Sequence, residues 1–154
     1  MYVPFPEEVP EDNRHIEAMA CWHQSMAGGT LCYRRGDLVA AEAYFCRALE
    51  VAREMLDCGG QRDQAATAYV LARHSLADTL ERGGRSHWAL HHWFGAHRKL
   101  ELLFAEAPSA SARKAILPHL QRTRSAFLAA LSRHPSRHGG AALPRLCAQR
   151  FDLH

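Results

Sequence analysis

One pattern of small and large residues occurs twice in this chain, at a constant separation of 48 residues. When residues 21–56 are aligned with residues 69–104, six positions match in size without a gap. The matched pairs are Gly29 with Ala77, Cys32 with Leu80, Gly36 with Gly84, Ala41 with Ala89, Phe45 with Trp93, and Ala48 with Ala96. An internal repeat of this kind is typical of architectures that stack one supersecondary unit. We therefore expect the fold to contain such a unit twice.

Each copy predicts a helix, a tight turn and a second helix. The turns are residues 35–37 and 82–86, and both contain glycine, which ends a helix by adopting the left-handed conformation. After the turn, the side-chain oxygen of Asp37 or Ser86 is expected to cap the next helix. Apolar residues recur at three- and four-residue spacings on both sides of each turn, which indicates amphipathic helices with one packing face.

The second helix of each copy places a large aromatic residue between two alanines, Phe45 in the first copy and Trp93 in the second. Small residues let two helices approach closely while the aromatic ring fills the space between them. This arrangement resembles the tetratricopeptide repeat, whose signature is a small residue in the first helix, glycine at the turn, and Ala-aromatic-Ala in the second helix. The residues that carry the resemblance are Gly29, Gly36, Ala41, Phe45 and Ala48, then Ala77, Gly84, Ala89, Trp93 and Ala96.

The resemblance covers residues 20–104 and departs from the family pattern in two respects. The usual repeat is about 34 residues long, so a separation of 48 residues indicates a long-helix variant, with longer helices or a loop at residues 58–60. The family's proline near the end of the second helix is missing, and Arg53 and Glu101 lie there instead.

We predict an all-α fold: antiparallel helix hairpins stacked as a tetratricopeptide-like α–α superhelix with a C-terminal capping helix at residues 109–133. Pro118 is expected to kink or divide this capping helix. Residues 13–133 are predicted to form a single domain of five main helices. Residues 1–12, rich in proline and acid, are expected to be extended and mobile, and residues 134–154 to form a basic tail.

Composition supports a globular protein, with 47% hydrophobic and 23% charged residues. The opening residues lack the basic flank and apolar run of a secretory signal, and no apolar stretch approaches the roughly 18 residues that span a bilayer. The five cysteines form no CxxC pair, so we expect reduced thiols and a cytoplasmic location. Arginine greatly outnumbers lysine, which favours a bacterial source.

The resemblance implies that the first helix of each pair lines a concave groove, which binds an extended peptide or a partner's helix. The candidate groove residues are His23, Met26, Thr30, Tyr33 and Arg34 in the first copy, and Leu71, His74, Asp78, Glu81 and Arg82 in the second. Aromatic residues and arginine are enriched where interfaces concentrate their binding energy, so this mixture suits a binding surface. The alternative is that these are ordinary exposed residues without a ligand.

The last third of the chain is basic, although the formal charge of the whole chain is only +3. Residues 109–154 carry eight basic residues against the single acid Asp152. Four arginines are candidate phosphate contacts: Arg122, Arg124, Arg133 and Arg137. Neutralising phosphates adds affinity without reading a base sequence, but no nucleic-acid motif accompanies them. A solvated face, or a patch that docks the acidic N-terminus, is the preferred interpretation.

Histidines gather in residues 87–97, where His87 and His91 lie one helical turn apart. This spacing suits two ligands of a metal ion. The HExxH pattern is missing, however, and neither an acid nor a cysteine accompanies them, so they are only a weak candidate and we predict no native metal site. Because the sequence holds no known catalytic motif, we also predict no cofactor and no enzymatic activity.

The predicted function is therefore protein–protein interaction, as an adaptor, chaperone-like or regulatory protein. A nucleic-acid-associated regulator that uses the basic last third is the alternative. Two repeats are fewer than the roughly three that usually bury a continuous core. The exposed end of so short a stack is a natural interface, so we also predict a homodimer.

Overall fold

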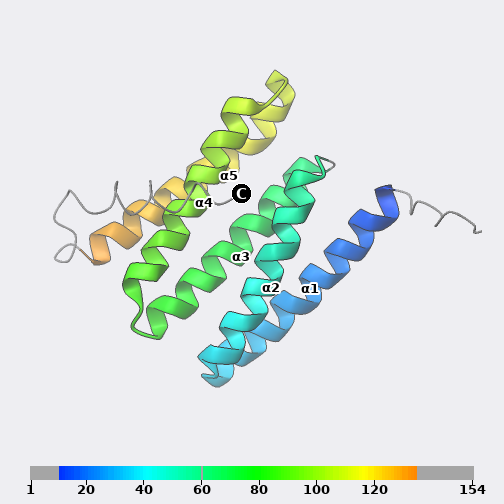
Figure 1. Cartoon of the computed structure of the whole chain (residues 1–154). Coiled ribbons are helices and arrows are strands. Elements are labelled where there is room, and N and C mark those ends of the chain that lie inside the picture. The colour runs from blue at the N-terminus through cyan, green and yellow to red at the C-terminus, as the bar shows by residue number, and fades with distance from the viewer. Residues whose placement is uncertain (1–10, 60, 135–154) are drawn as a thin grey trace, which may run out of the picture. The chain divides into compact units, whose positions relative to one another are not determined.

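The computed structural model describes residues 11–59 and 61–134, and nearly all of them are helical. The five helices are α1 (Glu11–Arg35), α2 (Leu38–Asp57), α3 (Arg62–Arg82), α4 (Ser86–Glu106) and α5 (Ala110–Arg133) (Figure 1). The described residues contain no strand. The prediction of an all-α chain of helix hairpins is confirmed. Residues 1–10 and 135–154, for which an extended N-terminus and a basic tail were predicted, lie outside the described residues, and α1 already includes Glu11 and Asp12.

The chain divides into two compact units, residues 1–72 and residues 73–154. In the described residues, the first unit contains α1, α2 and the first half of α3. The second unit contains the remainder of α3 with α4 and α5. The boundary falls inside α3, which is one continuous helix.

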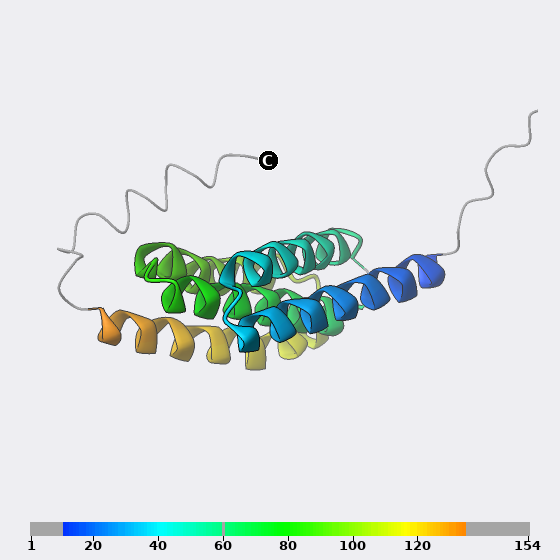
Figure 2. The same ribbon diagram turned by 90° about the horizontal axis from the view of Figure 1, so that it is seen from below.

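In the first unit, α1 and α2 pack as an antiparallel hairpin (Figures 1 and 2). Gly36 closes the turn with a φ of 81°, a left-handed conformation in which a Cβ would be strained. The side chain of Asp37 then accepts a hydrogen bond from the amide of Ala40 at 3.1 Å and caps α2. Both features of the predicted first turn are confirmed.

The hairpin is held by an aromatic ring that lies against a glycine. Phe45 is 3% exposed, and an ideal Cβ built on Gly29 would approach its ring to 2.5 Å. Ala41 and Ala48, on either side of Phe45, have no exposed surface at all. Gly29 therefore gives the ring of Phe45 the space that a side chain would occupy, as the alternation of small and large residues predicted.

The second unit repeats this plan with different residues. Ala77 and Trp93 occupy the positions of Gly29 and Phe45, and they are 0% and 3% exposed. The turn between α3 and α4 uses Gly84, with a φ of 77°. The predicted cap at Ser86 is wrong, because Arg85 is the N-cap residue and makes no side-chain capping hydrogen bond. Ser86 is already the first residue of α4, so its hydroxyl lies past the position from which it would cap.

Helix α5 packs on α4, where the rings of Phe94 and Phe127 lie with their centroids 5.3 Å apart. Its N-cap residue is Ser109, whose hydroxyl accepts a hydrogen bond from the amide of Ala112 at 3.1 Å. Pro118 does not divide the helix, which runs from Ala110 to Arg133 without interruption. Pro118 removes the hydrogen bond to the carbonyl of Lys114. Both residues are on the exposed side, where water can replace the lost donor.

Longer helices and a break together explain the long repeat. Helix α2 continues to Asp57 and α3 begins at Arg62. Between them, Gly59 adopts a φ of 71°. The longer helices and the loop near residues 58–60, which were the two predicted explanations for the 48-residue separation, are therefore both present.

Replacing Gly29 with alanine is expected to destabilise the protein by about 1–2 kcal/mol, because overpacking at the ring of Phe45 outweighs the better helix propensity of alanine. Urea denaturation followed by circular dichroism would measure the change. In a Phe45→Leu background the same substitution should cost less, since the two positions are coupled through this contact. A stabilising Gly29→Ala change would show that the ring does not constrain this position.

Candidate functional site

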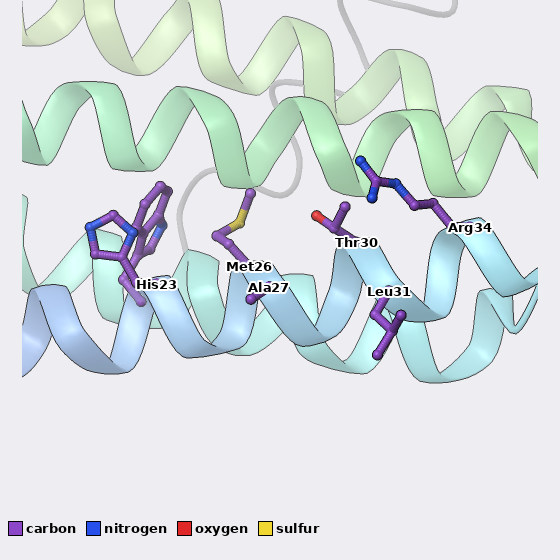
Figure 3. A pocket seen from close by; sticks show the side chains of 7 residues that line it. His23, Met26, Ala27, Thr30, Leu31 and Arg34 are labelled. Atoms are coloured by element: carbon purple, nitrogen blue, oxygen red, sulfur yellow. The ribbon is translucent and has the colours of Figure 1, made fainter.

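A cavity of about 550 Å³ lies along α1 in the first unit. Four of the predicted groove residues line it: His23, Met26, Thr30 and Arg34. Its other lining residues are Trp22, Ala27 and Leu31. Met26, Thr30 and Arg34 follow one another at four-residue spacing along the helix, so their side chains point to the same side (Figure 3).

The indole of Trp22 anchors this cavity. Its ring is 6% exposed, and its Nε1 donates a hydrogen bond to the backbone carbonyl of Ala68 in α3 at 3.2 Å. The imidazole of His23 lies edge-on to this indole, with the ring centroids 5.0 Å apart. A buried tryptophan whose N–H is paired forms a rigid wall. Trp22 is not among the groove residues predicted from the sequence, although an aromatic residue next to the groove candidate His23 was a usable signal.

The cavity combines apolar surface with positive charge. Met26 supplies a flexible, polarisable side chain that adapts to irregular ligands. Arg34, at one end, carries a guanidinium that suits a carboxylate or another anion. Among the described residues that line the cavity, none is an aspartate or a glutamate. The site is therefore suited to a ligand with an apolar group and a negative charge.

The other predicted groove residues lie elsewhere. Tyr33 is half-buried and does not line the cavity, and Leu71 is 40% exposed on α3. His74, Asp78, Glu81 and Arg82 belong to the second unit. Of these, His74, Asp78 and Glu81 interact with charged residues at and near α5.

Glu81 joins the C-terminal ends of α3 and α5. Its carboxylate accepts hydrogen bonds from Nε and Nη2 of Arg133 at 3.0 and 3.2 Å, and the ring Nε2 of His134 lies 2.8 Å from Oε1. The same guanidinium lies 5.1 Å from the ring centre of Trp93, within the range of a cation–π interaction. Arg133, a predicted phosphate contact, is thus engaged by an acid and an aromatic ring of its own unit.

Burial and neighbouring charges shift the pKa values of three side chains in the second unit. Burial, with a smaller contribution from the charge of Arg122, lowers the pKa of His74 to about 4. Burial raises the pKa of Asp78, the charge of Glu81 adds to this rise, and Arg133 opposes it. Burial alone would raise the pKa of Glu81, but the hydrogen bonds and charges of Arg133 and His134 bring it below the ordinary value. His74 is therefore neutral at pH 7.

The remaining phosphate candidates are only partly described. Arg122 and Arg124 are exposed on α5, and Arg137 lies outside the described residues. The whole of α5 contains no aspartate or glutamate. A basic surface therefore exists on this helix.

The two histidines that were weak metal candidates pack against tryptophan. The rings of His87 and His91 both lie edge-on to Trp88, with centroid distances of 6.0 and 6.4 Å. In the described part of the chain, no group of three or more His, Cys, Asp or Glu side chains is placed to hold a metal ion. A pair of histidines alone lacks the three or four protein ligands of typical zinc sites.

A buried arginine is the main feature that sequence reasoning missed. Arg73 is 5% exposed, and its Nη1 donates to Nδ1 of His92 at 2.9 Å. A Cβ on Gly95 would lie 2.8 Å from this nitrogen, so the glycine provides the space for the guanidinium. Gly95 in the middle of a predicted helix, where glycine is unfavourable, was the available signal.

Comparison with known proteins identifies a family. The sequence pattern of the family described as "Protein of unknown function (DUF2753)" matches residues 20–149. Neither a curated protein nor a solved structure matches the chain. None of the described helices is long and apolar enough to cross a bilayer.

The low pKa of His74 predicts a pH dependence of stability. Since the unfolded histidine titrates near 6.5 and the folded one near 4, the unfolded state binds the additional proton between these values. The contribution of His74 to the free energy of unfolding is therefore fully present above about pH 6.5, and it decreases as the pH falls toward 4. By pH 5 this one group should remove about 1–2 kcal/mol.

Urea denaturation at pH 7 and pH 5, compared between the wild type and His74→Gln, would measure this loss. The variant should lose less stability than the wild type over the same interval. An equal loss in both proteins would show that His74 is protonated as easily in the folded state as in the unfolded one.

Proposed function

The chain belongs to this DUF2753 family, and we propose that it is a protein-binding module that holds a segment of a partner in the cavity along α1. The observation that carries the proposal is the meeting of Trp22, Met26 and Arg34 around one space of about 550 Å³. This volume falls within the range of ordinary ligand sites, which reaches from about 300 to 1,000 Å³.

The composition of the cavity supports a peptide segment as the ligand. Tryptophan and arginine dominate the binding energy of many protein interfaces, and a methionine accommodates side chains of different shape. Arg34 favours a segment with an acidic residue near its apolar anchor. The likeness to tetratricopeptide repeats points the same way, because that family uses the first helix of a pair for binding. We propose holding rather than catalysis, as an adaptor, chaperone-like or regulatory protein.

Substitution within the cavity is expected to abolish partner binding without unfolding the chain. The test is affinity capture from the lysate of the source cell, followed by titration of each captured and purified protein against wild type and a Met26→Ala, Arg34→Ala double variant. Losing the apolar side chain of Met26 and the guanidinium of Arg34 should weaken binding tenfold or more, about 1.4 kcal/mol or above.

The matched control is Arg53→Ala with Ala43→Gly, two exposed positions on α2 that do not line the cavity. This control should bind like the wild type. If the captured proteins bind the cavity variant as tightly as the wild type, the cavity is not the binding site for these proteins. Circular dichroism of each variant verifies that the helices are intact.

A nucleic-acid-associated regulator is the second candidate, supported by the acid-free helix α5 with exposed Arg113, Lys114, Arg122 and Arg124. If α5 contacts phosphates, binding of a generic RNA or DNA duplex should weaken steeply with salt. A Lys114→Gln, Arg124→Gln variant should reduce the slope of log K against log salt by roughly two. Binding that is undetectable at low ionic strength would exclude this candidate.

A further inference from the structure

The residues that line the cavity all belong to α1, where they form two neighbouring rows. One row runs from Trp22 to Arg34 and the other from His23 to Leu31, both at four-residue spacing. Met26 of the first row points to one side of the helix, and Leu31 of the second row points to the other (Figure 3). The cavity is therefore a groove between two rows of side chains, and we call it the α1 groove.

This arrangement is the one by which helices pack on each other. Rows of side chains at four-residue spacing form ridges on a helix surface, and in the commonest class of packing a ridge of one helix enters the groove between two ridges of another. The residues in the middle of the α1 groove, Ala27 and Thr30, are small, and neither is buried. They leave room for a second helix to approach to the usual interaxial distance of about 8–10 Å.

An extended peptide fits the α1 groove less well, because its backbone would find few partners there. The backbone groups of α1 bond to one another within the helix. From Trp22 to Arg34 the groove is about 18 Å long, which an extended segment of about five residues spans with about ten backbone polar groups. The lining side chains available to them are those of His23, Thr30 and Arg34, since the indole N–H of Trp22 already bonds to Ala68. A helical segment satisfies its own backbone groups.

The charge of Arg34 determines the register of such a helix. Arg34 is exposed at one end of the groove, and Met26 lies eight residues before it, about 12 Å along the axis. A ridge residue of the partner that contacts Met26 is therefore eight positions away from the ridge residue that faces Arg34. A guanidinium favours a carboxylate at that position.

We propose that the occupant of the α1 groove is an amphipathic helix of a partner protein, with a large apolar, a small and an acidic residue at successive four-residue spacings. The apolar residue lies beside Trp22 and Met26, the small residue lies over Ala27 and Thr30, and the carboxylate pairs with Arg34. This inference rests on the proposed function and names the form of the segment that the cavity holds.

The first test selects peptides from two phage-displayed libraries on the immobilised full chain. One library varies several positions on one side of a stable helix built from alanine and glutamine. The other varies consecutive positions between prolines, which keep the segment extended. Phage that bind the Met26→Ala, Arg34→Ala variant are removed. We expect binders from the helical library, with apolar and acidic residues eight positions apart and dissociation constants of about 10–100 μM.

The second test exchanges charges between the chain and a synthetic peptide from this selection, with binding measured by fluorescence anisotropy. Arg34→Glu in the chain, or lysine in place of the acidic residue of the peptide, should weaken binding about threefold to tenfold, and the two together should restore it. The matched control is Arg35→Glu, which makes the same change at an exposed neighbour that does not line the cavity and should bind like the wild type. Proline in the middle of the peptide should abolish binding, because it breaks the helix.

Two outcomes would overturn this inference and leave the proposed function intact. One is binders from the extended library alone. The other is a set of helical binders for which Arg34→Glu has no more effect than Arg35→Glu. Failure of the proposed function gives a different result, in which neither library yields peptides that distinguish the wild type from the cavity variant, and that result would overturn both.

Discussion

The contact between the ring of Phe45 and the backbone at Gly29 is the interaction on which the first unit depends. The ring lies where a side chain of residue 29 would be, and the fully buried Ala41 and Ala48 lie on either side of it along α2. Interiors are packed as densely as organic crystals, so an aromatic ring of this size requires an equally specific vacancy on the facing helix. This contact sets how closely α1 and α2 approach, and hence which side of α1 remains available for binding.

The second unit uses the same plan and strengthens it with polar contacts. Trp93 replaces Phe45, and its ring is covered by the guanidinium of Arg133, which Glu81 holds in place. The larger aromatic thus links α3, α4 and the end of α5. A second arginine, Arg73, is buried against His92 and Gly95. Burying a guanidinium group is costly unless the group is hydrogen-bonded. The hydrogen bond from Arg73 to His92 therefore also specifies how α3 and α4 pack.

The cavity lies on α1 because only part of that helix is used for packing. The residues that pack α1 onto α2 and α3, such as Trp22 and Gly29, use only part of its circumference. The remainder carries the residues that line the cavity. Within the described part of the first unit, exposed α1 residues such as Ile16 and Leu31 show which sides of the helix α2 and α3 leave uncovered.

The sequence alone determined the helices, the glycine turns and the packing residues, because these depend on local periodicity and on the sizes of residues at matched positions. Gly36, Gly84 and the buried partners Phe45 and Trp93 could all be predicted in this way. Four of the ten groove candidates line the cavity, since periodicity selects one face of a helix but not what that face meets. Only the tertiary structure brought Trp22 to Ala68, Arg133 to Glu81 and Arg73 to His92. Each of these pairs is separated by at least 19 residues along the chain, and its geometry arises from packing between helices rather than from local sequence.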